Sequence, residues 1–266
     1  MIKFNRFKDG KAFVLTMSYD DGRTADRRLV EIFNKYGIKG TFHLNSGFLD
    51  TNTYISADEV KSLYEGHEVS CHTARHPYLT QLPDISVIHE TLNDRIALEK
   101  LCGYVVRGMS YPFGAYDDRV IDVLKTCGIV YSRKVASTMG YQLPTDFMTW
   151  EPTCHHSRCL EAAKPFMEKA IADAKAYPLL FYVWGHSYEF DRDNNWDLIE
   201  EFCKTVGGRD NVWYATNIEI YDYIMAQRNL HIAADESIIH NPSRIDVWIT
   251  KDGETVKILA GETVYF

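Results

Sequence analysis

Short apolar runs alternate with longer amphipathic stretches along most of the chain. Residues 12–19 are almost all apolar, which is typical of a strand buried on both faces. Strands are expected at 12–19, 38–44, 67–71, 104–111, 128–133, 178–185 and 211–215. Helices are expected at 24–36, 57–65, 84–101, 117–126, 160–176, 196–206 and 217–228. This alternation predicts an α/β fold in which βα units form a parallel barrel, either closed or incomplete.

The pattern changes in the last part of the chain, where helical periodicity is lost. Short runs of alternating apolar and polar residues occur at 245–249, 255–259 and 263–266. A turn at Lys251-Asp252-Gly253 separates the first two runs, which predicts a small antiparallel sheet. Such a sheet is too short to be stable alone. We therefore expect a barrel over 1–230 and a β extension over 231–266, packed on the barrel or on a partner subunit.

Three aromatic residues of the extension, Trp248, Tyr265 and Phe266, allow two interpretations. They either bury the inner face of the hairpin, which is the more common use of such residues, or form a platform for a sugar ring.

Composition and charge narrow the class of protein. The chain has 266 residues, of which 45% are hydrophobic and 25% charged, as in ordinary globular proteins. A net charge of −8 argues against nucleic acid and anionic membranes as partners. The six cysteines show no Cys-x-x-Cys pair and are expected to be buried free thiols. With no apolar leader in the first ten residues, we expect a cytoplasmic protein, although a leader removed earlier would leave no trace.

A candidate metal site follows from two short segments. Asp20-Asp21-Gly22 ends the first predicted strand, and His72 and His76 follow the third. An Asp with two His residues four apart suits zinc or a similar divalent ion and leaves a position open for water or substrate. The second Asp is then free to act as a base. The plainer interpretation is a simple turn, because Asp and Gly are turn residues.

Four motifs in order give the chain a resemblance to a known family. They are Met17-Ser-Tyr-Asp-Asp-Gly22, His72-Thr-Ala-Arg-His76, Ser110-Tyr-Pro-Phe-Gly114 and Leu179-Leu-Phe-Tyr-Val-Trp-Gly-His186. Together they resemble the polysaccharide deacetylases of carbohydrate esterase family 4, the NodB-homology domain. The resemblance implies a distorted (β/α)7 barrel, here with a small C-terminal antiparallel β extension.

The resemblance also implies roles for individual residues. Asp21, His72 and His76 would hold one divalent ion, zinc first, with cobalt, nickel or manganese as alternatives. Asp20 would be the general base and His186 the general acid. Glu189 and Asp191 are the carboxylates close enough in sequence to His186 to keep it protonated. The backbone N–H of Phe113 would help to stabilise the oxyanion.

Two departures from the family pattern affect the surroundings of the site. Ser110 stands where the family has an Arg that braces the catalytic Asp. Arg107 is close in sequence, but an offset of three along a strand points to the opposite face, so Arg133 is the other candidate. The family's Asp-x-x-Asp-Trp motif is absent, and the nearest stretch is 146–156. Residues expected to contact substrate are Tyr111, Pro112, Trp150, Trp184, His155 and His156, of which the two His are alternatively metal ligands or exposed loop residues.

The sequence therefore predicts a metal-dependent deacetylase acting on an acetylated saccharide, with an N-acetylated amino sugar as first choice. An O-acetyl sugar esterase and a C–N hydrolase of small amides use the same chemistry and remain alternatives. A sugar-binding scaffold without activity is a third, against which the presence of all five polar site residues argues. The oligomeric state is left open, and a homo-oligomer is compatible with the sequence.

Overall fold

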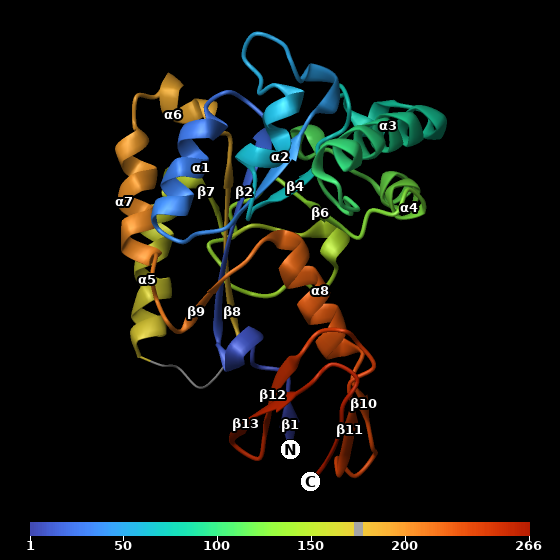
Figure 1. Cartoon of the computed structure of the whole chain (residues 1–266), viewed down its shortest axis with the longest axis vertical. Helices are drawn as coiled ribbons and strands as arrows, with labels where there is room; N and C mark the ends of the chain where they lie inside the picture. Colours follow the sequence, from blue (N-terminus) through green and yellow to red (C-terminus); the bar gives the residue numbers. More distant parts are fainter. Residues whose placement is uncertain (173–177) are drawn as a thin grey trace.

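The structure of the chain is a computed structural model that describes residues 1–172 and 178–266. A curled parallel sheet lies at its centre (Figure 1). Its strands are β2 (Phe13–Asp21), β3 (Gly40–Leu44), β4 (Glu68–Cys71), β5 (Gly108–Ser110), β6 (Tyr131–Arg133), β7 (Cys154–His155), β8 (Leu179–Gly185) and β9 (Val212–Tyr214). They pair in the order β6-β5-β4-β3-β2-β8-β7, and β9 pairs with the first part of β2. The predicted distorted (β/α)7 barrel is confirmed.

Helices cover the outer face of the sheet. They are α1 (Asp26–Lys35), α2 (Val60–Leu63), α3 (Asp84–Cys102), α4 (Asp118–Thr126), α5 (Cys159–Ile171), α6 (Tyr188–Arg192), α7 (Trp196–Val206) and α8 (Asn217–Arg228). Each of the seven predicted helices is present, although 57–65 is divided into a 3-10 turn and α2, and 173–176 of the fifth lie outside the described residues. The short elements β7 and α6 were not predicted, because two to five residues show no measurable period. None of the helices in the described ranges is long and apolar enough to cross a membrane.

The strand β2 shows how the sequence separates the inside of the barrel from its outer layer. Phe13, Leu15, Met17 and Tyr19 belong to the apolar core that also includes residues of the covering helices. The alternate positions Val14, Thr16, Ser18 and Asp20 are also buried, but on the other face. Successive side chains of a strand point to opposite faces, so this alternation sends a polar row along the inside of the barrel. Asp20 ends that row.

Buried polar groups inside the barrel are linked by hydrogen bonds. The carboxylate of Glu68 accepts hydrogen bonds from Tyr131 Oη at 2.6 Å, Thr41 Oγ1 at 3.0 Å and the Ile218 N–H at 2.9 Å. Burial raises the pKa of Glu68 to about 7. The interior is therefore a polar network whose charge depends on pH near neutrality.

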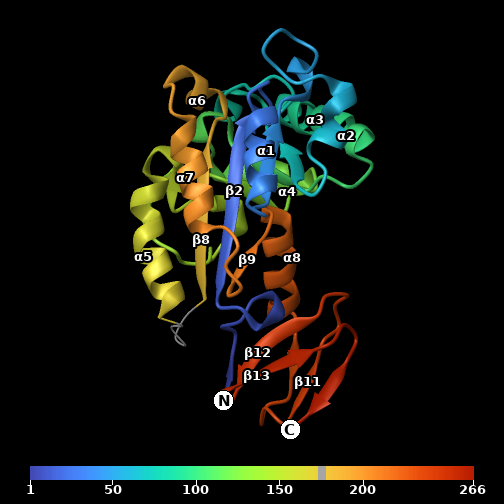
Figure 2. The same cartoon turned by 60° about the vertical axis from the view of Figure 1, so that its left-hand side comes forward.

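The C-terminal extension consists of two three-stranded antiparallel sheets, not one. The first contains β1 (Ile2–Lys3), β12 (Val247–Lys251) and β13 (Glu254–Ile258), and the second contains β10 (His231–Ile232), β11 (Ile238–His240) and β14 (Thr263–Tyr265). Asp252 and Gly253 join β12 to β13 with φ of 51° and 95°, as a type I′ turn requires. Because β1 pairs with β12, the first residues of the chain belong to the same unit as the last ones. Both sheets lie at the end of the barrel where β2 begins (Figures 1 and 2).

Trp248 connects this unit to the barrel. Its backbone N–H donates to Tyr223 Oη at 3.0 Å, and its carbonyl accepts from Gln227 Nε2 at 3.0 Å; both partners lie on α8. The terminal aromatic residues do not share this role, since Tyr265 is 73% exposed and Phe266 is 49% exposed. Of the three aromatic residues, only Trp248 therefore packs on the inner side. All six cysteines are buried thiols, as expected.

Candidate active site

Strand register places the four motifs at one end of the sheet. Tyr19 is level with Gly185, so Asp20 and His186 follow at the same height on neighbouring strands. Asp21 is level with Leu44, which is level with Cys71, and His72 comes directly after it. In parallel sheets the carboxyl ends of neighbouring strands share one edge, which is where sites of α/β proteins form. The site therefore lies at the opposite end of the barrel from the C-terminal sheets.

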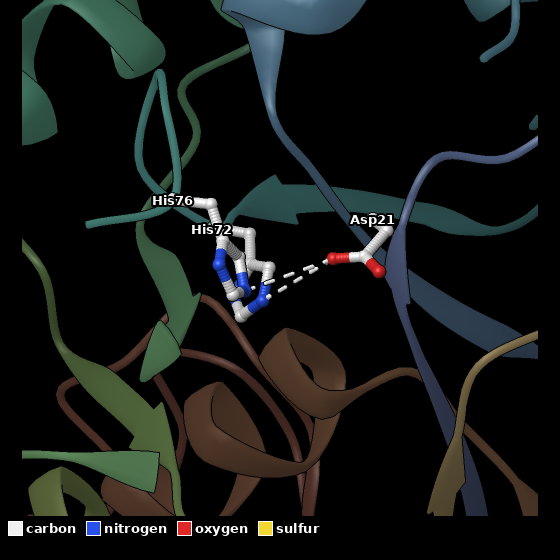
Figure 3. A group of neighbouring side chains, drawn as sticks. All are labelled: Asp21, His72 and His76. Carbon is white, nitrogen blue, oxygen red and sulfur yellow. Dashed lines mark ion pairs between the residues drawn. The ribbon is translucent and has the colours of Figure 1, made fainter. Parts of the chain in front are cut away.

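Asp21, His72 and His76 form a group that could hold a metal ion. One carboxylate oxygen of Asp21 lies 3.7 Å from His72 Nε2 and 3.8 Å from His76 Nε2 (Figure 3). The two rings meet edge to face, with their centroids 4.6 Å apart. Ligands of one tetrahedral zinc ion lie about 3.4 Å apart, given bonds near 2.0–2.1 Å. The two distances to Asp21 are thus within a few tenths of an ångström of those that a shared divalent ion requires.

The second ring nitrogen of His72 supports this fit. Its Nδ1 lies 2.9 Å from the carbonyl oxygen of Ser110, an acceptor that fixes the proton on Nδ1 and leaves the Nε2 lone pair facing Asp21. Burial lowers the pKa of His72 to about 3, so the ring is neutral, as a metal ligand must be. The acceptor that the sequence did not identify is thus a backbone group of the third motif.

The backbone of this site adopts conformations that residues other than glycine rarely take. Asp21, Thr73, His76 and Phe113 have φ of 82°, 65°, 56° and 58°. Such geometry costs of order 1–3 kcal/mol per residue and persists only where the surroundings enforce it. Four such residues in the motifs that form one site indicate that the fold holds these side chains in a required geometry.

The loop with His72 and His76 is held by side chains from two other elements. Asn45 Nδ2 donates to the carbonyl oxygens of His72 at 2.6 Å and Thr73 at 2.9 Å. On α3, Asp94 accepts from the His72 N–H at 3.0 Å, and Glu90 accepts from the Arg75 N–H at 2.9 Å. These bracing residues were not predicted, because they lie outside the four motifs.

Asp20 is buried and held by two partners. Arg133, from β6, donates from Nη2 to Asp20 Oδ2, and Ser110 Oγ donates to Asp20 Oδ1 at 3.0 Å. Burial would raise the pKa of Asp20, but the charge of Arg133 holds it well below its ordinary value. Asp20 is therefore a carboxylate at any physiological pH.

Arg107, the other candidate for this bracing role, is paired elsewhere. Its Nη2 lies 2.6 Å from Asp222 Oδ2 on α8, and both side chains are about one-third exposed. The two arginines differ because Ser110 is level with Arg133 on the neighbouring strand, whereas Arg107 precedes β5. The expectation that Arg107 supports the site is wrong.

His186 belongs to a second group of polar side chains. Its Nδ1 lies 3.6 Å from Glu189 Oε2, which also lies 2.9 Å from His155 Nε2 and 3.3 Å from His156 Nε2. Burial lowers the pKa of His186, but the carboxylates of Glu189, Asp20 and Asp21 outweigh it and raise that pKa above its ordinary value. Asp191 is engaged elsewhere, since its Oδ1 accepts from Trp196 Nε1 at 2.8 Å.

Aromatic side chains surround both groups. Phe113 packs on the ring of the candidate ligand His76, with centroids 4.5 Å apart, and stacks on Tyr78 at 3.8 Å and 8°. Phe113 and Tyr78 are 50% and 44% exposed, which leaves flat apolar surface beside the site. Tyr78 was not predicted. The guanidinium carbon of Arg133 lies 4.6 Å from the ring centroid of Trp184. The ring centroids of Trp184 and His155 are 4.9 Å apart.

Three residues expected to contact substrate are buried instead. Trp150 is fully buried between Tyr182 and Phe147, with ring centroids 5.0 and 4.9 Å away. Tyr111 is 1% exposed and donates from Oη to the carbonyl of Met148, while Pro112 is buried at the start of a 3-10 turn. These expectations are wrong, because the large apolar side chains at these three positions fill the space between secondary-structure elements. His156 is also buried, whereas His155 is partly exposed.

The chain is similar to known proteins in sequence and in fold. The sequence profile of the family Polysaccharide deacetylase matches residues 7–132. Among solved structures, the chain resembles a Mycobacterium smegmatis protein assigned to the polysaccharide deacetylases, with 17% identity, a TM-score of 0.63, and coverage of 84% of this chain and 93% of the other.

Two further solved structures share the fold. The Xyl-CE4 domain of a multidomain xylanase from the hindgut metagenome of Trinervitermes trinervoides has 14% identity, a TM-score of 0.56, and coverage of 80% and 92%. A family 4 carbohydrate esterase from Streptomyces lividans, in complex with acetate, has 15% identity, a TM-score of 0.50, and coverage of 77% and 93%. The chain spans less than two thirds of some matched structures, 61% of a Streptococcus pyogenes deacetylase and 44% of a Bacillus cereus polysaccharide deacetylase.

No curated protein matches the chain by sequence. At these identities the structural neighbours establish the fold alone, whereas the sequence profile covers the chain from shortly before β2 into β6, including three of the four motifs. Residues 7–132 therefore match the polysaccharide deacetylase family, and the chain as a whole has the distorted (β/α)7 barrel of such deacetylases.

Proposed function

We propose that the chain is a metal-dependent hydrolase that removes acetyl groups from a carbohydrate, with an N-acetylated amino sugar as first substrate. The observation that carries this proposal is the meeting of two polar groups at one end of the barrel. Asp20, Asp21, His72 and His76 form one group, and His186 with Glu189 forms the other. Asp20 and His186 directly follow the register partners Tyr19 and Gly185 on neighbouring strands, which supports a single site made of both groups.

Asp21, His72 and His76 would hold a divalent ion, zinc first, which when bound polarises the acyl oxygen and lowers the pKa of water. The geometry that supports this ligand set is the pair of distances of 3.7 and 3.8 Å around one oxygen of Asp21. His72 is also neutral, and its Nδ1 contacts the Ser110 carbonyl, which leaves Nε2 free to bind an ion. Both observations support the same ligand set.

Asp20 is the proposed general base. Arg133 and Ser110 orient its carboxylate and keep it ionised, so it is always ready to accept a proton. The same partners make it a weak base, and it therefore depends on a water that has been made more acidic. Asp20 needs no contact with the ion itself to act in this way.

His186 is the proposed general acid for the leaving group. The carboxylate of Glu189 favours the protonated ring, which is the form that can give a proton to a departing amine. The backbone N–H of Phe113 is proposed to stabilise the oxyanion, and the left-handed conformation of Phe113 shapes that turn.

A carbohydrate substrate is supported by the exposed aromatic surface beside the site. Phe113 and Tyr78 present flat faces next to His76, and such faces suit the apolar side of a sugar ring. An O-acetyl ester or another small amide would use the same catalytic groups, so these remain alternative substrates. A sugar-binding scaffold without activity would have no need of the strained backbone at Asp21 and His76.

Release of acetate from N-acetylglucosamine oligomers, detected by mass spectrometry, tests the proposal. The protein should be measured as purified, after chelator treatment and after zinc is added back, with Asp20→Asn as the matched inactive control. Acetate release that is lost with chelator and regained with zinc is expected. If acetylated sugars bind but neither amide nor ester is cleaved under any metal condition, the scaffold interpretation replaces this one.

A further inference from the structure

One carboxylate oxygen, Glu189 Oε2, is approached by three imidazole nitrogens. They are His155 Nε2 at 2.9 Å, His156 Nε2 at 3.3 Å and His186 Nδ1 at 3.6 Å. Glu189 itself is largely buried, and its pKa is held low by His155 and His186 in spite of its burial. A carboxylate surrounded by imidazole nitrogens is a common set of ligands for a divalent ion.

Hydrogen bonding does not account for all of these contacts. Within the described ranges, the buried Nδ1 atoms of His186 and His156 have no hydrogen-bond partner. For His186 the nearest acceptor, Glu189 Oε2, is beyond hydrogen-bond distance at 3.6 Å. Buried polar atoms without partners are uncommon, and an absent ion is one explanation for them.

The spacing fits a metal ion. One ring nitrogen of His155, one of His186 and a Glu189 oxygen all lie within 4.8 Å of one another. Ligands of a tetrahedral zinc ion are about 3.4 Å apart, so the His186–Glu189 distance of 3.6 Å already fits and the 2.9 Å contact between His155 and Glu189 has to lengthen. When His155 Nε2 binds an ion, its proton must move to Nδ1, where Ser157 Oγ at 2.9 Å can accept the hydrogen bond.

We propose that His155, His186 and Glu189 form a second divalent metal site, separate from Asp21, His72 and His76, and that an ion bound there inhibits the enzyme. The site follows from the geometry alone, whereas the inhibition rests on the proposed function. An ion on His186 Nδ1 takes the position that a proton occupies in the active acid. The ring then carries a single N–H, bound too tightly to be given to a leaving amine at neutral pH.

The binding test uses zinc or cobalt alone and needs no activity. In His72→Ala/His76→Ala protein, which has lost two ligands of the first site, titration calorimetry should still find about one ion per chain. Cobalt bound there should show the visible absorption of a four-coordinate ion. Adding His155→Ala should weaken this binding on the order of tenfold or more, since even the loss of a partner outside the ligand set costs 10–100-fold.

A cross-strand pair elsewhere supplies the matched control. His231 and His240 are register partners with ring centroids 5.7 Å apart, an arrangement that can bind zinc adventitiously. Adding His231→Ala in place of His155→Ala should leave the remaining ion bound. If His231→Ala removes the ion and His155→Ala does not, or if no ion binds, the second site does not exist.

Inhibition is tested in the otherwise unaltered chain. Zinc added beyond the first equivalent should slow release of acetate from an N-acetyl sugar much more than from an acetyl nitrophenyl ester, because nitrophenolate leaves without an acid. His155→Ala should raise the zinc concentration for half-inhibition on the order of tenfold or more. Equal inhibition of both substrates would overturn the inhibitory role. A chain without hydrolase activity that still binds the second ion would refute the proposed function but keep the site.

Discussion

Arg133 donates a hydrogen bond to the carboxylate of Asp20, although 113 residues separate them in the sequence. Both side chains are almost completely buried, so this is an ion pair withdrawn from water. Arg133 occupies the role expected of an arginine in the third motif, where this chain has Ser110. The pair therefore joins Asp20, which belongs to the first motif, to Arg133, which belongs to none of the four.

Arg133→Met is expected to lower the free energy of unfolding by about 3–5 kcal/mol, because it leaves the Asp20 charge buried without a partner. Arg107→Met is the matched control, since its pair with Asp222 is partly exposed and such pairs contribute about 1 kcal/mol or less. Urea unfolding of both variants measures the difference. An equal loss of unfolding free energy in both variants would show that the buried pair with Asp20 contributes no more to stability than the exposed pair with Asp222.

Asp20→Asn is expected to keep the ion and lose about 10²-fold or more in rate, because a base role does not require coordination. Asp21→Ala is expected to lose the ion instead. Elemental analysis, together with acetate release, separates the two variants. An Asp20→Asn protein as active as the parent at every pH would exclude Asp20 as the base.

His186→Ala is expected to cut hydrolysis of an N-acetyl sugar on the order of 10²-fold more than that of an acetyl nitrophenyl ester. The physical reason is that an amine must be protonated to leave, whereas nitrophenolate need not be. Rates on both substrates and the metal content of the variant are the measurements. Loss of both activities to the same degree, with the metal retained, would assign His186 to positioning.

The pKa of Glu68 makes a prediction about stability. Because its pKa in the folded protein, about 7, lies above the ordinary value of 4.5, the folded state binds more protons than the unfolded state between these values. The free energy of unfolding should therefore fall as pH rises through this window, by at most about 3 kcal/mol from this group. Glu68→Gln should show a smaller fall between about pH 5 and about pH 8. Identical pH profiles from urea unfolding would contradict the shift.

The C-terminal sheets are expected to serve stability, not substrate recognition. Trp248→Ala should cost about 2–3 kcal/mol, because Trp248 packs on the barrel, while the exposed Tyr265→Ala should change stability by about 0.5 kcal/mol or less. KM for an acetylated sugar should be the same in both variants, since the site lies at the other end of the barrel. A raised KM in Tyr265→Ala would reveal a sugar platform instead.

The sequence by itself determined the elements and the ends of the strands. Runs such as 12–19 and 84–101 differ enough in length to distinguish strand from helix, and the ends of most long elements were predicted within two residues. Strand ends in a parallel sheet share one edge, so the order of the motifs is enough to assign Asp20, Asp21, His72 and His186 to one site. Elements and strand ends can be predicted from sequence because they depend on hydrophobic patterns and turn residues, which involve only residues close together in the chain.

Only the tertiary structure decided which residues meet across the chain. Arg133 and Arg107 are both close to strand ends, and register alone made one the partner of Asp20 and the other of Asp222. Trp150 looks like a pocket residue in a polar segment, yet it fills the core. The pairing of β1 with β12 joins the two ends of the chain. These contacts depend on strand register and on how volumes fill space, which are properties of the whole fold and not of neighbouring residues.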